Sequence, residues 1–315
     1  MQINPQLARR SALGGAFIWA IVLFFRTAPS AETELIDKVL LLGVLVVVPL
    51  ALSLVAVSQE GLSPAFGYRL AVAAQPFGAA AVIASFFLEQ GIRAALLASV
   101  WLGVTSLIAI YGLWRLSLNS LRSVAEVSID VGLVYLSVGS GWLVMSRLGV
   151  QPLGFGDTIV LLTAVHFHFA GFAAPILTGL AGRRLLEAPQ KFQRPFVLAA
   201  VCVTIGTPLV ATGISLSPFL ALVGTLVIAG GLALLAVLVI VRIVPALTSL
   251  PARLLLLLSS ASAVIAMVLA LLYAYSIVTR TVIIDIPQMA MSHGLINAFG
   301  FSLCGLLGWA IVVSD

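Results

Sequence analysis

The chain has 315 residues, of which 62% are hydrophobic and only 9% are charged, and its mean hydropathy is +1.21. Ordinary soluble domains carry about 25% charged residues, so this composition excludes a soluble protein and predicts a polytopic membrane protein. The net charge of +5 is not accompanied by a basic nucleic-acid-binding motif. This excludes nucleic acid as a partner and indicates arginine-rich cytoplasmic loops instead.

The apolar runs predict helices rather than the strands of a barrel. They are continuous over about 18–25 residues, which suits membrane-spanning helices, whereas barrel strands alternate in segments of about 10 residues. We therefore expect an all-α transmembrane helix bundle that forms a single integral membrane domain over residues 1–315. The ten predicted spans cover residues 11–28, 38–58, 67–88, 92–114, 124–146, 157–181, 195–217, 220–244, 251–276 and 287–313.

The distribution of Arg and Lys predicts the orientation of these spans. With the N-terminus in the cytoplasm, the inside segments carry eleven basic residues and the outside segments five, in keeping with the positive-inside rule. We therefore expect a multi-pass protein of the lipid bilayer with both termini in the cytoplasm. The five basic residues expected outside are Arg26, Lys38, Arg93, Arg147 and Arg280.

All three histidines of the chain fall inside predicted spans. His166 and His168 lie in the sixth span and His293 in the tenth. An ionisable residue at the centre of a membrane helix costs about 2.5–3.5 kcal/mol, so each histidine is a candidate for a functional site. At the helical rise per residue, His166, His168, His293 and Asn297 lie about 13, 16, 9 and 15 Å below the outer surface. The histidines are therefore expected in one layer of the membrane.

The faces of the two helices limit how these side chains can meet. His166 and His168 point about 160° apart on an ideal helix, so both can serve one compact site only if the helix is distorted. Pro175 predicts a kink just after them, while His293 and Asn297 share one face of the tenth span. We expect His293 and at least one of the other two histidines to face a common cavity in the outer half of the bilayer.

Two stretches stand out for their histidines and aromatic residues: His166-Phe167-His168-Phe169-Ala170-Gly171-Phe172, followed by Pro175, and His293-Gly294-Leu295-Ile296-Asn297-Ala298-Phe299-Gly300-Phe301. Together they resemble the pattern of YndJ-like bacterial membrane proteins, mainly over spans six to ten. The resemblance implies a multi-pass protein of the bacterial cytoplasmic membrane in which these histidine motifs recur. It supports them as a site and leaves the reaction open.

Proton transfer is the chemistry that these residues favour, because an imidazole donates or accepts a proton near pH 7. The predicted catalytic residues are His166, His168, His293 and Asn297. Trp101 and Phe172 supply an aromatic wall for a lipophilic small molecule, isoprenoid- or polyketide-like, and Asp130 is a further candidate for substrate contact. Isomerisation, cyclisation or epoxide opening would fit such a site.

A metal ion or haem is an alternative use of the histidines. His166, His168 and His293 are ligand types for copper, zinc or iron, and His168 with His293 could hold a haem from two sides. The divergence of the paired histidines and the lack of a carboxylate at their depth weigh against a metal. No cofactor is firmly implied.

Transport of a small molecule is the second alternative. Glu126 and Asp130 lie four residues apart on one helix face and could relay protons. The structural interpretation is that Glu126 sits at the membrane interface and that Asp130 pairs with Arg122 or a hydroxyl. Prolines at Gln75-Pro76 and Thr207-Pro208 predict broken helices in the third and seventh spans, as found in transporters.

Overall fold

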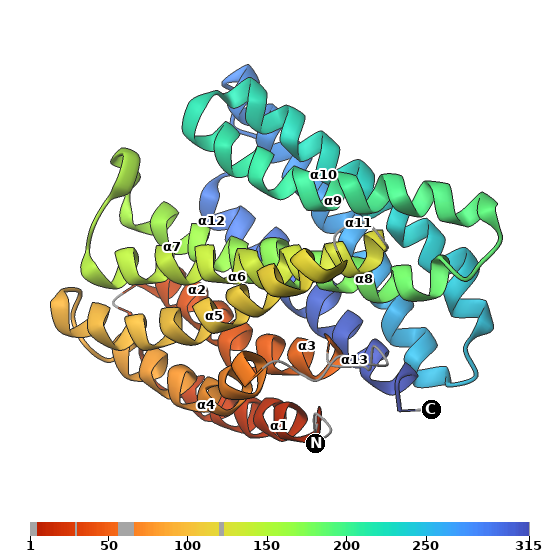
Figure 1. Ribbon diagram of the computed structural model, residues 1–315. Coiled ribbons are helices and arrows are strands. Elements are labelled where there is room, and N and C mark those ends of the chain that lie inside the picture. The colour runs from red at the N-terminus through yellow and green to blue at the C-terminus, as the bar shows by residue number, and fades with distance from the viewer. Residues whose placement is uncertain (1–4, 29, 56–65, 120–122, 315) are drawn as a thin grey trace. The chain divides into compact units, whose positions relative to one another are not determined.

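The computed structural model describes residues 5–28, 30–55, 66–119 and 123–314, and all regular structure within these ranges is helical. Its α-helices are α1 (Pro5–Val22), α2 (Ala31–Leu42), α3 (Val48–Val55), α4 (Phe66–Phe86), α5 (Ile92–Asn119), α6 (Val124–Leu148), α7 (Asp157–His166), α8 (Ala174–Leu185), α9 (Gln190–Leu216), α10 (Pro218–Leu238), α11 (Leu250–Thr279), α12 (Ile286–Met289) and α13 (Cys304–Val312) (Figure 1).

Nine stretches of the described residues are long and apolar enough to cross a membrane. They correspond to the second to tenth predicted spans and confirm an all-α polytopic membrane protein. They are Ala31–Val55, Phe66–Phe86, Ile92–Ser117, Val124–Leu148, Asp157–Leu185, Gln190–Leu216, Pro218–Ala246, Leu250–Thr279 and Ile286–Val312. The predicted first span overlaps α1, which carries Arg9 and Arg10 near its start and is not among the nine. The orientation of the termini stays a prediction.

Five π-helical segments interrupt the long helices. They are η1 (Gly43–Val47), η3 (Phe167–Ala173), η4 (Val239–Ile243), η6 (Ala290–Gly294) and η7 (Ile296–Leu303). A π-helix pairs residues five apart instead of four and is frequent at functional sites. Both histidine motifs coincide with such segments, so the distortion that the sequence placed after the first motif begins within it, at Phe167.

The chain divides into two compact units, which are described separately. The first contains residues 1–118 and 130–173 and the second residues 119–129 and 174–315. In the first unit, glycines let neighbouring helices approach closely, as small residues do in membranes. A Cβ on Gly78 of α4 would lie 3.0 Å from Trp101 of α5, and one on Gly112 of α5 would lie 2.8 Å from the Asp130 carbonyl oxygen of α6.

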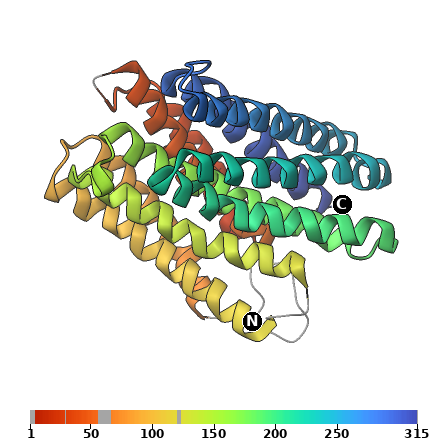
Figure 2. The ribbon, with the colours of Figure 1, turned by 90° about the horizontal axis from the view of Figure 1, so that it is seen from above.

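In the second unit, α9 and α10 form a hairpin whose helices run side by side (Figures 1 and 2), and α11 packs along α10. Glycines again mark the contact: Gly206 of α9 lies against Ile228 of α10, and Gly231 of α10 lies against Cys202 of α9. These glycines leave no room for a side chain, so close backbone packing explains them.

The two predicted helix breaks are wrong. α4 continues through Pro76 and α9 continues through Pro208. A proline removes one backbone hydrogen bond, and membrane helices tolerate that loss when neighbouring groups satisfy the freed backbone. Gln75 acts as a connector instead, because its Nε2 donates to the Val44 carbonyl at 3.0 Å and its Oε1 accepts from the Ser11 hydroxyl.

Candidate functional site

His168 is fully buried in the first unit, and both of its ring nitrogens are engaged. Nδ1 lies 2.8 Å from the Ala164 carbonyl oxygen, and Nε2 accepts a 3.1 Å hydrogen bond from Nε1 of Trp101. This is a neutral imidazole with a donor on one side and an acceptor on the other. The structure therefore brings two predicted site residues together, but as a hydrogen-bonded pair inside the core.

The other residues predicted near His168 also lie in packed surroundings. Phe172 is fully buried. His166 is half-buried, and its ring meets that of Phe167 edge to face at 6.0 Å between centroids. Of the two histidines in this motif, His166 is the more exposed.

Asp130 forms an ion pair inside the first unit. Its Oδ1 lies 2.6 Å from Nε of Arg115, and both side chains are buried. Arg115 is a partner that the sequence interpretation did not name, and α5 extends far enough to bring it to α6. The predicted pairing with Arg122 lies outside the described residues. This ion pair connects α5 to α6, so the Asp130 carboxylate has a structural role.

Glu126 belongs to the second unit and has a different partner. Its two carboxylate oxygens accept hydrogen bonds from Nε and Nη2 of Arg183 at 2.7 and 3.0 Å. This bidentate geometry is the strong form of an Arg–carboxylate contact. Glu126 and Asp130 thus hold separate arginines.

His293 and Asn297 lie together in the second unit, where η6 and η7 follow each other. Nδ1 of His293 lies 2.8 Å from the Ala266 carbonyl oxygen of α11, and Nε2 lies 3.5 Å from Nδ2 of Asn297. The carbonyl contact places the proton on Nδ1 and leaves the Nε2 lone pair as an acceptor. The predicted meeting of His293 with His166 or His168 joins residues of the two units and stays a prediction.

The residues that the structure describes contain no group of three His, Cys, Asp or Glu side chains arranged to hold a metal ion. His168 already has partners on both nitrogens. The metal and haem interpretations gain no support from this donor set.

A cavity of about 770 Å³ lies at one end of the first unit. Its lining comes from the chain after α1, the start of α2, the α4–α5 connection, the end of α6 and the start of α7. In the predicted topology all of these segments face outside. The rim includes exposed charged side chains, whereas the interior includes two buried ones, Asp37 and Arg147. The lining residues are Arg26, Thr27, Ala28, Thr33, Asp37, Phe86, Phe87, Leu88, Glu89, Gln90, Ser146, Arg147, Asp157, Thr158 and Leu161.

Arg147 is fixed in this cavity by the end of α4. Its Nη2 donates to the carbonyl oxygens of Ser85 and Leu88 at 3.0 and 2.7 Å, and its Nε donates to the Ser85 hydroxyl at 3.2 Å. The Ser85 carbonyl lies in the last turn of α4 and also accepts from the Leu88 backbone N–H, whereas Leu88 follows the end of the helix. The guanidinium also lies over the Phe86 ring, 5.0 Å from its centroid. Arg147 therefore stays in place without a carboxylate.

Asp37 reaches the cavity from α2. This helix begins where it does because the Ser30 hydroxyl accepts a 3.1 Å hydrogen bond from the Thr33 backbone N–H, a preferred N-cap arrangement. Asp37 lies in the second turn of α2, and it is only 2% exposed. Asp37 and Arg147 are not within the 4.0 Å of an ion pair, and no such pair involves Asp37 among the described residues. An acidic and a basic side chain, both buried, thus line one cavity without forming an ion pair.

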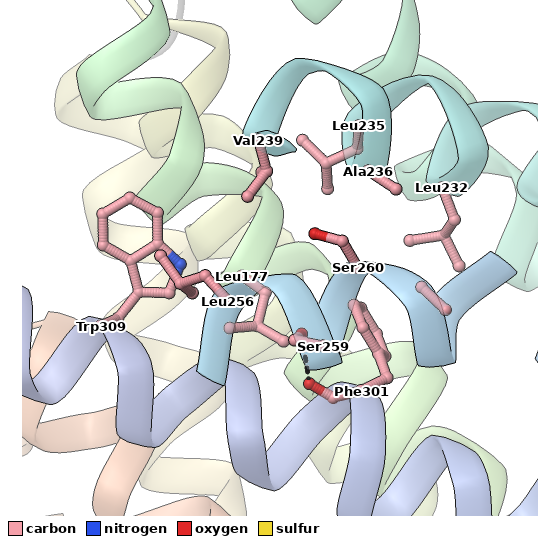
Figure 3. A pocket seen from close by; sticks show the side chains of 11 residues that line it. Leu177, Leu232, Leu235, Ala236, Val239, Leu256, Ser259, Ser260, Phe301 and Trp309 are labelled. Carbon is pink, nitrogen blue, oxygen red and sulfur yellow. Dashed lines mark hydrogen bonds between the residues drawn. The ribbon is translucent and has the colours of Figure 1, made fainter. Parts of the chain in front are cut away.

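A second, much smaller cavity of about 30 Å³ lies within the second unit (Figure 3). The hydroxyl of Ser260 points into it, while that of neighbouring Ser259 donates to the Phe301 carbonyl oxygen at 2.7 Å. Most of the remaining lining is aliphatic or aromatic. This volume suits a water molecule and is too small for an organic ligand, so we place the candidate site at the larger cavity.

Comparison with known proteins gives the family of the chain. The model of the family described as "YndJ-like protein" matches residues 38–301, more than four fifths of the chain. The chain belongs to the YndJ-like family. It is 32% identical over 214 residues to a protein of Bacillus subtilis (strain 168) named "Uncharacterized membrane protein YndJ". That alignment covers 68% of this chain and 38% of the relative, so the chain corresponds to less than half of the relative's length. No solved structure matches.

The YndJ-like match confirms the resemblance seen in the histidine motifs, and it extends well beyond them toward the N-terminus. It includes Arg147, and it begins one residue after Asp37. Neither residue was predicted as part of a site from the sequence, because Arg147 served only to indicate orientation and Asp37 is not a basic residue that the positive-inside rule counts. The available signal was Asp37 itself, an acidic residue directly before a long apolar run.

Proposed function

We propose that this membrane protein binds a small amphipathic molecule in the cavity that Asp37 and Arg147 line. The observation that carries the proposal is the pair of buried, opposite and separate charges in one cavity. Ligand sites are concave, have volumes of about 300–1,000 Å³ and place a few polar groups among apolar ones. The cavity's volume of about 770 Å³ falls in this range.

The lining supports a ligand with both an apolar and a polar part. Phe86, Phe87, Leu88 and Leu161 provide apolar surface, while Asp37 and Arg147 provide charge. A lipophilic ligand is also what the aromatic residues of the sequence indicated, although Trp101 and Phe172 are core residues and Asp130 is held by Arg115. Binding, as in a carrier or a receptor for an amphipathic molecule, is the function that this lining supports best.

Blocking the cavity tests the proposal. Thr158 lines the cavity near the start of α7, and neighbouring Ile159 does not. We expect native mass spectrometry of wild-type protein, purified from membranes in a neutral detergent, to detect a retained small molecule. Thr158→Trp is expected to lose it, whereas the matched control Ile159→Trp keeps it. Identical retained molecules in all three proteins would contradict the proposal.

A second candidate function is proton transfer on a lipophilic substrate at His293 and Asn297. The specific observation in its favour is that the Ala266 carbonyl fixes one ring nitrogen of His293, while the other faces Asn297 at 3.5 Å. A fixed tautomer with an available lone pair is the arrangement of a general base. Asn297 would orient a substrate oxygen.

Proton transfer at His293 should not depend on the large cavity, and a deuterium-exchange experiment tests this. Membranes containing the wild-type protein are incubated with bacterial lipid extract in heavy water, and deuterium incorporation into lipids is measured by mass spectrometry. His293→Gln, which keeps a side-chain donor for Ala266, is expected to abolish incorporation, while Thr158→Trp leaves it unchanged. Equal incorporation in His293→Gln and wild type would exclude this chemistry.

A further inference from the structure

The charges of the cavity specify the polar part of its ligand, an inference that rests on the proposed binding function. Three hydrogen bonds hold Arg147, and all three acceptors are neutral: two carbonyl oxygens and one hydroxyl. Nη1 donates no hydrogen bond to any of the described residues. The guanidinium is therefore fixed in position, but its positive charge is not neutralised by a carboxylate within ion-pair distance.

The cations near Asp37 have other partners. Nζ of neighbouring Lys38 lies 2.5 Å from Oε1 of Glu34 and also donates to the Leu23 carbonyl at 3.1 Å. Nε of Arg26 lies 4.0 Å from the other oxygen of Glu34, with its side chain mostly exposed. The Asp37 carboxyl group is thus buried beside the cavity and forms no ion pair within the described ranges.

A ligand that fills the cavity displaces water from Asp37 and Arg147, and an acidic or basic group that loses water without gaining a counter-ion is costly. A purely anionic ligand would neutralise Arg147 and meet repulsion from Asp37. A purely cationic ligand would do the reverse. Only a ligand that carries both charges compensates both Asp37 and Arg147.

We infer that the cavity binds a zwitterion, with its phosphate or carboxylate at Arg147 and its ammonium group at Asp37. The anion would complete the guanidinium's hydrogen bonding at Nη1, as charge-assisted contacts with Arg do. The ammonium would donate to the Asp37 carboxylate. The apolar lining favours an amphiphile with such a headgroup, a phosphoethanolamine lipid being the simplest, over the free headgroup.

Calorimetry on the full chain in dodecyl maltoside micelles tests this inference with three soluble probes. They are dihexanoyl phosphatidylethanolamine, which is zwitterionic, dihexanoyl phosphatidylglycerol, which lacks the ammonium group, and free phosphoethanolamine, which lacks the acyl chains. We expect the zwitterionic lipid to bind about tenfold more tightly than the anionic one, the ratio that about 1.4 kcal/mol provides. Tighter binding of free phosphoethanolamine would instead assign the site to the free zwitterion.

The Asp37→Asn variant tests whether Asp37 distinguishes the ethanolamine lipid from the glycerol lipid. It keeps the size of the side chain and removes its charge, so the preference for the ethanolamine lipid over the glycerol lipid should disappear while Arg147 still holds the phosphate. Arg147→Lys retains a positive charge and is expected to keep the preference with weaker binding of both lipids. Folding of each variant is checked by size-exclusion chromatography and thermal unfolding in the same detergent.

The outcomes separate the inference from the proposed function. If both lipids bind equally to the wild type, or if Asp37→Asn retains the preference, the zwitterion inference is overturned while amphiphile binding stands. If neither lipid nor phosphoethanolamine binds and Thr158→Trp retains the same molecules as wild type, the proposed function fails with it.

Discussion

His168 and Arg147 are both buried polar side chains of the first unit, and both are held by hydrogen bonds, yet their surroundings differ in one respect. The partners of His168 match it fully: a carbonyl and an indole N–H complete a neutral ring. The partners of Arg147 are neutral while its guanidinium is charged, and Asp37 lines the same cavity without contacting it. A buried polar side chain whose hydrogen bonds are complete, such as His168, therefore has a structural role. A buried ionisable side chain that lines a cavity without a counter-ion, such as Arg147, is a candidate for ligand binding.

The largest expected effect comes from breaking the His168–Trp101 pair. His168→Ala leaves a hole in the core and an indole N–H without an acceptor, and it is expected to lower the free energy of unfolding by about 2–5 kcal/mol. Thermal unfolding in detergent and membrane abundance measure the loss. His166→Ala is the matched control, because its half-buried ring is expected to matter little for stability. Equal losses in both variants would refute the assignment of His168 to the core.

A smaller loss is expected from Gly139→Ala on α6. A Cβ there would lie 2.8 Å from Cβ of Phe167 and 2.9 Å from Nδ1 of His168. Such overpacking costs about 1–3 kcal/mol, measured by the same unfolding experiment. Gly141→Ala on the same helix is the control, since its Cβ would have no other atom within 4 Å and alanine favours helix. An unchanged Gly139→Ala protein would mean that His168 is less tightly enclosed than its contacts indicate.

The smallest expected effect has the opposite sign. Asp37→Asn removes a buried charge without an ion-pair partner, so it is expected to stabilise the folded protein by about 1 kcal/mol in the absence of ligand. His168→Asn, by contrast, is expected to destabilise it. Differential scanning fluorimetry of both variants in one detergent measures whether each substitution raises or lowers the unfolding temperature. If Asp37→Asn destabilises the protein as much as His168→Asn does, Asp37 is a structural residue of the core like His168.

The spans were predictable from sequence because continuous apolar runs such as Pro218–Ala246 are too long for barrel strands, so helices are the remaining way to satisfy their backbone groups in a membrane. The pairing of His168 with Trp101 was not predictable, although both residues were site candidates, because their sequence separation of 67 residues carries no information about distance. The cavity could not be predicted from the sequence either, because its lining residues are also far apart along the chain. Asp37 and Arg147 stand at the ends of different spans, and only the folded arrangement of the helices places both beside one cavity.

The π-helical segments have a consequence for insertions and deletions in this chain. Each fits an extra residue into a turn without changing the direction in which the flanking helix faces. Removing one residue from Gly43–Val47 or Ile296–Leu303 can therefore restore an ordinary turn and preserve the packing on either side. The same deletion within an uninterrupted helix such as α11 rotates all that follows by about 100°. Changes in chain length among related proteins should accordingly gather at these five segments.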